Sequence, residues 1–205
     1  MNYLAHAYLS FGIPELLAGN MISDFVKGKR KFQYPDKILT GIELHREIDS
    51  FTDSHPATIA AKKLFQDPYR LYSGAFIDIV YDHFLATDPQ IFTGQALMNF
   101  SLDTYRHLDD FQHLFPENFL ALFPYMKEHN WLYNYQYKWG IGNSFAGLVR
   151  RAKFLSSSSE AIRIFEDHYF ELQSYYRDFF PELAGFTAER IRSIESGQWP
   201  WRAPA

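Results

Sequence analysis

Histidine and aspartate side chains stand one helical turn apart at two places in the sequence. His45 and Asp49 are four residues apart, and Asp78 and Asp82 repeat that spacing, with His83 directly after them. Side chains at this spacing are neighbours on one face of an α-helix. Carboxylates and water suit Mg²⁺ or Mn²⁺, and imidazole shifts the preference toward Mn²⁺, Fe²⁺ or Zn²⁺. The pattern therefore indicates a divalent metal site, which could activate water and orient a phosphate.

Two further candidate ligands stand in apolar surroundings. His6 lies within the sequence LAHA, and Asp24 lies within MISDFV. An unpaired imidazole or carboxylate is costly in such an environment. A buried histidine is nonetheless more often bonded to a backbone carbonyl, and a single His-x-x-x-Asp pair is more often exposed. The residues alone thus leave a structural role open. A less specific group, with a surface location as its alternative, consists of His107, Asp109, Asp110 and His113.

The segments that must position these side chains have helical periodicity. Apolar residues recur at steps of three and four in residues 38–52, 69–86 and 158–180, which predicts three amphipathic helices. Pro35 and Asp36 can open the first helix, and we expect Pro181 to end the last. No segment alternates cleanly enough to predict a strand. Turn residues divide the chain into about seven or eight helices. We therefore predict one compact all-α domain over residues 1–195, with residues 196–205 as a loose tail.

Composition excludes several classes of protein. The chain has 205 residues, of which 47% are hydrophobic, so that a large core can form. It contains no cysteine, which excludes disulfides, thiolate nucleophiles and cysteine-bound metals. No stretch approaches the roughly 20 apolar residues of a membrane helix, and the first residues do not form a secretory signal. We therefore expect a cytoplasmic protein without a membrane partner. A net charge of −4 argues against nucleic-acid binding.

Positive charge is nevertheless concentrated in two basic clusters. The first places four cations within five residues, and the second follows a glycine-rich stretch. Clusters of this kind attract an acidic partner or a phosphate, although a solvated surface is the alternative for each. The first cluster consists of Lys27, Lys29, Arg30 and Lys31, and the second of Arg150 and Arg151, with Lys153 close by.

Four motifs resemble those of bacterial acyl carrier protein phosphodiesterases, also called acyl carrier protein hydrolases. In chain order they are NYLAH (residues 2–6), GNMISDFVKG (19–28), GIELHREIDSFTD (41–53) and DIVYDHFL (78–85). Weaker similarity continues at Gly147 with the second basic cluster and over residues 168–181. Residues 87–130 match poorly. The candidate ligands His6, Asp24, His45, Asp49, Asp82 and His83 all fall inside the matching motifs.

The resemblance implies a helical, metal-dependent phosphohydrolase distantly similar to the HD superfamily. The implied reaction is hydrolysis of the phosphodiester between 4′-phosphopantetheine and a serine of holo acyl carrier protein, which gives the apo protein. The implied metal is Mn²⁺, and Mg²⁺ or Fe²⁺ would also suit the ligands. HD proteins carry an adjacent His-Asp pair, whereas this chain has Asp82-His83 in the reverse order. Ligand assignments therefore cannot be copied from HD enzymes.

From the matching motifs we expect metal ligands among His6, Asp24, His45, Asp49, Asp78, Asp82 and His83. Asp24, His45, Arg46 and Asp82 are the expected catalytic residues. The Arg46 guanidinium would neutralise phosphate oxygens, and a salt bridge to Asp49 or Glu43 is its alternative role. Because acyl carrier protein is small and strongly acidic, both basic clusters are expected to bind it.

Two other functions stay open at this point. The first is an HD-like phosphohydrolase that acts on a nucleotide or another small phosphodiester. The second is a non-catalytic helical protein that binds an acidic partner. The sequence does not predict the oligomeric state.

Overall fold

A computed structural model describes residues 1–196 and confirms the all-α class, since these residues contain eleven α-helices, four short 3-10 helices and no strand. The α-helices are α1 (Tyr3–Tyr8), α2 (Pro14–Ile22), α3 (Asp36–Ser54), α4 (Pro56–Tyr69), α5 (Ser73–Ala86), α6 (Ala96–Asp109), α7 (Glu117–Glu128), α8 (Trp131–Asn134), α9 (Lys138–Arg151), α10 (Ser159–Asp167) and α11 (Tyr169–Glu195). The 3-10 helices are η1 (Ser23–Phe25), η2 (Gly28–Gln33), η3 (Arg70–Tyr72) and η4 (Gln112–Leu114). Apart from Ser196, the expected loose tail lies outside the described residues.

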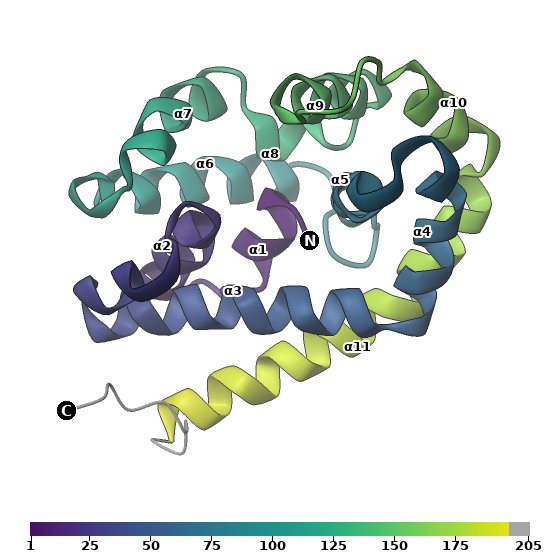
Figure 1. Cartoon of the computed structure of the whole chain (residues 1–205). Coiled ribbons are helices and arrows are strands. Elements are labelled where there is room, and N and C mark those ends of the chain that lie inside the picture. Colours follow the sequence, from purple (N-terminus) through teal and green to yellow (C-terminus); the bar gives the residue numbers. More distant parts are fainter. Residues whose placement is uncertain (197–205) are drawn as a thin grey trace.

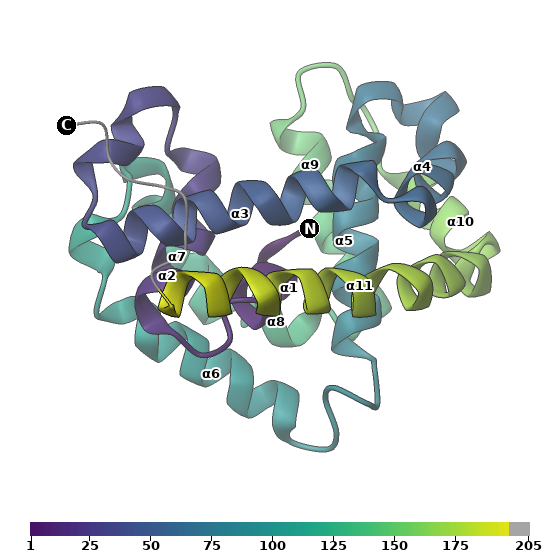
Figure 2. The same ribbon diagram turned by 90° about the horizontal axis from the view of Figure 1, so that it is seen from below.

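The long helix α3 crosses the molecule, and α11 runs beside it in the opposite direction (Figures 1 and 2). The short helix α1 lies over the middle of α3, next to the N-terminus. Helices α6 to α8 and α9 to α10 form the upper part of the view in Figure 1, while α4 and α5 close one side. Helix α1 carries the first of the four motifs and α5 carries the last. These two helices pack against each other near the centre of the molecule.

Helix α3 matches the helix predicted over residues 38–52. Its predicted stripe is buried, with Ile42 and Ile48 fully enclosed and His45 only 5% exposed. Asp36 in its first turn is favourable to the helix dipole. Burial of the apolar stripe therefore turns His45 toward the interior, and Asp49 one turn later lies beside it.

Two glycines bring α2 and α3 into backbone contact. A Cβ atom on Gly19 would lie 2.1 Å from the Ile38 carbonyl oxygen, and one on Gly41 would lie 2.4 Å from the Leu16 carbonyl oxygen. No side chain fits at either position, so the helices cross with their main chains touching. This crossing places the residue after Gly19, Asn20, next to His45.

The helix predicted over residues 158–180 is divided in two, and Pro181 does not end it. Helix α10 stops at Asp167, and α11 begins after His168 and continues through Pro181 to Glu195. A proline within a helix removes one main-chain hydrogen bond. Phe179 and Leu183, on either side of it, are fully buried, and their packing outweighs that loss. The proline signal was therefore overridden by tertiary contacts.

The segment predicted as one helix over residues 69–86 is also divided. Tyr69 ends α4, and α5 begins only at Ser73. Between them Arg70 adopts a positive φ of 44°, which a continuous helix cannot include. Such divisions, together with the short helices α1 and α8, explain why the helices outnumber the expected seven or eight.

Within residues 1–196, no helix combines the length and the apolar character needed to cross a membrane.

Candidate functional site

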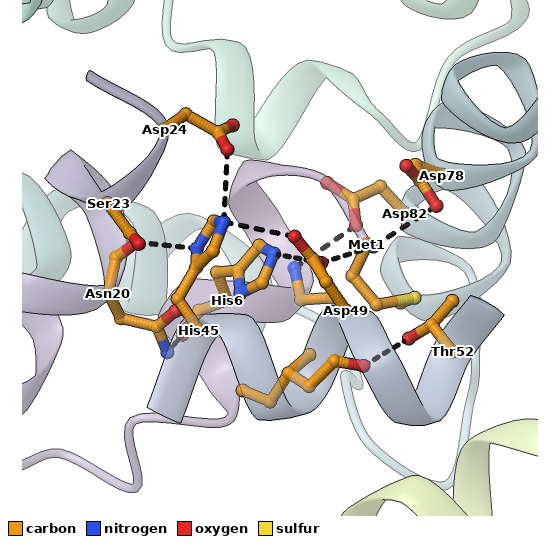
Figure 3. Close-up of polar contacts among 12 residues, drawn as sticks. Met1, His6, Asn20, Ser23, Asp24, His45, Asp49, Thr52, Asp78 and Asp82 are labelled. Carbon is orange, nitrogen blue, oxygen red and sulfur yellow. Dashed lines mark hydrogen bonds and ion pairs between the residues drawn. The ribbon is translucent and has the colours of Figure 1, made fainter. Parts of the chain in front are cut away.

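His45 is the most completely oriented side chain of the site. Its Nδ1 lies 2.8 Å from the Asn20 carbonyl oxygen, which can only accept, so Nδ1 carries the hydrogen. Its Nε2 then faces Asp24 Oδ1 at 3.2 Å and Asp49 Oδ2 at 3.1 Å (Figure 3). Burial alone would lower the pKa of His45, but its hydrogen bonds and charge interactions with the two carboxylates outweigh burial and raise the pKa to about 9. A backbone carbonyl thus holds the ring so that Nε2 points at two carboxylates.

His6, from α1, lies parallel to His45. The two ring centroids are 3.9 Å apart and the ring planes differ by 14°. His6 Nε2 is 3.3 Å from Asp49 Oδ1. Neither His6 nitrogen has a hydrogen-bond partner among the described residues, although the side chain is only 3% exposed. Burial and the neighbouring His45 lower the pKa of His6 to about 4, so its ring is neutral and keeps a lone pair.

Asp49 joins the two rings, because each of its oxygens faces a different histidine. One ligand atom each from His6, His45 and Asp49 lies within 4.8 Å of the others. Two imidazole nitrogens and a carboxylate oxygen converge on one place, and His6 Nε2 there, 3.3 Å from Asp49 Oδ1, has no hydrogen-bond partner among the described residues. That donor set fits a divalent ion such as Mn²⁺ or Fe²⁺. We call His6, His45, Asp49 and the adjacent Asp24 the His/Asp cluster.

Asp24 and Asp78 lie on opposite sides of the group formed by His6, His45 and Asp49. Asp24, on η1, has a side chain 70% exposed, and its hydrogen bond to His45 lowers its pKa. Asp78 instead faces the buried amino group of Met1, whose nitrogen is 3.1 Å from Asp78 Oδ1 and 3.2 Å from Asp49 Oδ1. Burial lowers the pKa of that amino group, but the two carboxylates outweigh burial and raise it to about 11. The Met1 ammonium therefore neutralises the inner side of the cluster and separates Asp78 from the histidines (Figure 3).

Asp82 holds the helix that carries His6. Its Oδ2 accepts a hydrogen bond from the Leu4 amide at 2.7 Å and its Oδ1 from the Ala5 amide at 3.1 Å. These are amides of the first turn of α1, which have no partner within the helix. The carboxylate is completely buried. Burial raises the pKa of Asp82 to about 7, although both amide hydrogen bonds act in the opposite direction.

His83 lies outside the cluster. Its Nδ1 donates to the Tyr135 carbonyl oxygen at 2.8 Å, and its Nε2 accepts from the Tyr169 hydroxyl at 3.0 Å. Both nitrogens are thereby used. Consecutive residues of an α-helix point in directions about 100° apart, so Asp82 and His83 cannot both face α1.

Arg46 is engaged on the flank of the site. Its Nη2 donates to the Val26 carbonyl oxygen at 3.2 Å, and its Nη1 lies 3.6 Å from Glu43 Oε1. The expected alternative, a salt bridge to Glu43, is therefore present. The contact with Val26 also fixes the segment that follows Asp24. Lys31 of the first basic cluster pairs with the same glutamate.

The remaining candidate residues are the cations of the two basic clusters and the four His and Asp residues between positions 107 and 113. Lys27, Lys29, Arg30, Arg150 and Arg151 form no salt bridge in the part of the chain that the structure describes. Asp109 pairs with Lys127 instead of joining its neighbours. Within residues 1–196, no second group of metal-type ligands includes His107, Asp110 or His113.

Sequence reasoning missed two residues that shape the site. Asn20 contributes its backbone carbonyl, which no side-chain pattern reveals, and its amide also donates to the His6 carbonyl oxygen at 2.9 Å. Tyr3 lies near the cluster: burial raises its pKa to about 12, the charge of Arg151 opposes this rise, and the charge of Asp24 adds to it. The only available signal was their position within the motifs that start at residues 2 and 19.

The amino-acid sequence is similar to those of known proteins over most of its length. The sequence model described as "Acyl carrier protein phosphodiesterase" matches residues 1–183. The acyl carrier protein phosphodiesterase of Photorhabdus laumondii is 33% identical over 188 residues, which cover 89% of this chain and 93% of that protein. Those of Serratia proteamaculans and Yersinia pestis are each 30% identical over 184 residues, which cover 89% of this chain and 95% of each relative. No solved structure gives a significant match. The chain therefore belongs to the acyl carrier protein phosphodiesterase family.

Proposed function

We propose that this protein hydrolyses the phosphodiester between 4′-phosphopantetheine and the serine of holo acyl carrier protein, with a divalent metal ion such as Mn²⁺ at the His/Asp cluster. Family membership supports the substrate. The observation that carries the metal site is the convergence of His6 Nε2, His45 Nε2 and Asp49 on one place, with the His6 nitrogens left without a hydrogen-bond partner.

An ion bound by these residues would supply Lewis-acid chemistry, lowering the pKa of water and polarising a phosphoryl oxygen. His6, His45 and Asp49 would hold it, and Asp24 at the exposed side would complete the ligands or accept a proton from the attacking water. In the reaction the water oxygen forms a bond to phosphorus, the bond between phosphorus and the serine oxygen breaks, and that oxygen takes up a proton. The products are 4′-phosphopantetheine and the serine hydroxyl of the apo protein.

Several residues of the chain support this chemistry without touching the substrate. The Asn20 carbonyl holds the hydrogen at His45 Nδ1, so that Nε2 is the nitrogen that would give up its proton and bind a metal. Asp82 fixes α1 and with it His6. Arg46 holds the main chain after Asp24 at Val26. We therefore assign Asp82 and Arg46 positioning roles.

The decisive experiment is intact-mass spectrometry of holo acyl carrier protein incubated with the purified enzyme, with Mn²⁺ and with a chelator. We expect loss of the phosphopantetheine mass only when metal is present. If folded, metal-loaded enzyme leaves the holo protein unchanged, the proposed substrate is wrong. Turnover of a nucleotide or another small phosphodiester by the same preparation would then identify a different phosphohydrolase.

Docking of the acidic carrier protein would use the first basic cluster. Lys27, Lys29 and Arg30 are exposed and form no salt bridge within the described residues, so their charge is available to a partner. Lys29→Glu with Arg30→Glu should raise KM for holo acyl carrier protein and weaken its salt dependence, with a smaller effect on kcat. The matched control is Lys63→Glu on α4 with Arg177→Glu on α11, two exposed cations that form no salt bridge within the described residues. An unchanged KM in the first variant would move the docking surface to Arg150 and Arg151.

A further inference from the structure

A cleft of about 800 Å³ lies near the His/Asp cluster. Its walls come from α1 and α5 on one side and from α7, α8 and α9 on the other, in the upper half of Figure 1. Asn2 and Ile79 in its lining are the chain neighbours of Met1 and Asp78, which contact each other at the inner side of the cluster. The cleft therefore comes close to the inner side of the cluster.

One end of the cleft is positively charged. Arg150 and Arg151, at the end of α9, line it and form no salt bridge with any described carboxylate. Tyr3, which also lines the cleft, lies close enough to both Arg151 and Asp24 for their charges to act on its phenol. Because Asp24 belongs to the cluster, this cationic end is the end nearest to it. A guanidinium at that position suits a phosphate group.

The rest of the cleft combines aromatic rings with amide groups. Trp131, Tyr135 and Trp139 supply apolar surface, and Trp139 is 56% exposed. The amides of Asn2 and Asn143 also line the cleft, and neither makes a side-chain hydrogen bond within the described part of the chain. A wall of this kind suits a flexible chain in which methylene groups alternate with amides. A purely apolar ligand would leave the asparagine amides without partners, which is unfavourable.

We propose that this cleft binds the 4′-phosphopantetheine arm of the substrate, with the phosphate at Arg151 and the two amides and the thiol end running along α9 toward Trp139. The proposal rests on the proposed function, because a phosphodiester that reaches the cluster must extend its arm from there. The cleft comes close to the cluster, its cationic end lies on that side, and its volume is that of a small-molecule site.

The test compares two identical substitutions at exposed asparagines. Asn143→Trp on α9 fills the cleft, whereas Asn99→Trp on α6 lies outside its lining and is the matched control. Binding of free 4′-phosphopantetheine is measured by isothermal titration calorimetry on each folded protein. We expect one site on the wild type, at least a tenfold weaker affinity for Asn143→Trp, and a change of less than twofold for Asn99→Trp. Trp139→Ala, which removes an exposed ring, provides a second cleft variant should the first not fold.

Enzyme assays separate the two hypotheses. The cleft variants should lose at least tenfold in kcat/KM for holo acyl carrier protein and less than threefold for bis(p-nitrophenyl) phosphate, which has no arm. Holo-protein turnover equal to wild type in both variants would overturn the cleft assignment and leave the proposed function intact. A wild type that does not act on holo acyl carrier protein would overturn the proposed function. In that event the calorimetric titration alone tests whether the cleft binds 4′-phosphopantetheine. An unchanged affinity in both cleft variants would then refute the cleft assignment.

Pantetheine without its phosphate tests the orientation of the arm. Wild type should bind it more weakly than 4′-phosphopantetheine, and Arg151→Gln should abolish that difference. If Arg151→Gln weakens both ligands equally, the phosphate does not lie at Arg151 and the proposed orientation is wrong.

Discussion

His83 and the His6–His45 pair are buried to a similar degree, yet their surroundings differ completely. His83 donates from Nδ1 to one carbonyl and accepts at Nε2 from one hydroxyl, so its neutral ring is fully paired. His45 has the same kind of carbonyl partner at Nδ1, but its Nε2 faces two carboxylates. His6 has no hydrogen-bond partner among the described residues.

This difference separates a structural histidine from a candidate ligand. Burial alone does not distinguish them, since His6 and His83 are each 3% exposed. What distinguishes them is whether the protein satisfies the ring nitrogens, because an unpaired buried polar atom is unfavourable unless something else binds it. The His6 ring nitrogens without hydrogen bonds within the described residues, close to Asp49, thus indicate a binding site for a ligand such as a metal ion.

We expect the largest difference between the His6–His45 pair and His83 in the effect of substitution on the catalytic rate. His45→Ala removes a ligand and should lower the rate of holo acyl carrier protein hydrolysis by roughly 10³-fold or more, as expected when a group that stabilises transition-state charge is lost. His83→Gln should stay within about tenfold of wild type. Intact-mass kinetics measure both, with circular dichroism to check folding. Equal losses in the two variants would remove the distinction between the regions.

Metal addition should stabilise the protein only where the His/Asp cluster is intact. At about 100 times its dissociation constant a ligand adds about 2.7 kcal/mol to the free energy of unfolding, so Mn²⁺ should raise Tm clearly and a chelator should reverse the rise. His83→Gln should show the same shift as wild type, and His45→Ala should show none. A full shift in His45→Ala would place the ion elsewhere.

Substitution of Asp82 tests whether its hydrogen bonds to α1 hold His6 in position. Asp82→Ala leaves two buried amides of α1 without an acceptor, which we expect to cost about 2–4 kcal/mol in the free energy of unfolding. Because His6 then loses its fixed position, activity should fall by about 10–100-fold. Asp82→Asn can still accept from one amide and should lose less on both measures. Urea denaturation and turnover are the measurements, and full activity in a folded Asp82→Ala protein would contradict the positioning role.

The smallest effect concerns the pH dependence of stability at His83. Burial lowers the pKa of His83 below its usual 6.5, so the unfolded chain takes up a proton below that pH while the native ring does not. Its contribution therefore reduces stability as pH falls below about 6.5, by at most about 1.4 kcal/mol per pH unit. His83→Gln should flatten this part of the profile in urea denaturation between about pH 7 and about pH 5. His6 contributes with the same sign in both proteins and cancels in the difference, so parallel profiles would disprove the assignment.

Part of the observed arrangement was predictable from spacing, and the rest depends on directions that spacing does not give. The four-residue step from His45 to Asp49 predicted one shared helix face, and the structure also brings His6 and Asp24, which stand in apolar stretches of sequence, next to these side chains. Arg46 and His83 were included because they adjoin good candidates in sequence, but adjacent helical residues point about 100° apart. Spacing rules also could not reveal the Asn20 carbonyl, because a main-chain group has no residue-specific signal.

The fold shows the same limits. The all-α class and helix α3 were predictable from periodicity. The continuation of α11 through Pro181 was not, because long-range packing of Phe179 and Leu183 decides it.

The hydrogen bonds from α1 to Asp82 also determine the order in which the molecule can assemble. Six residues are too few to remain helical alone, so α1 acquires its conformation only when α5 docks on it. The bonds connect residues 77 and 78 positions apart, and closing so long a loop has an entropic cost, so we expect these contacts to form late in folding. On this expectation, His6 reaches Asp49 only near the end of the folding reaction. A metal ion that needs both would then act on the completed fold, slowing unfolding while leaving the rate of folding almost unchanged.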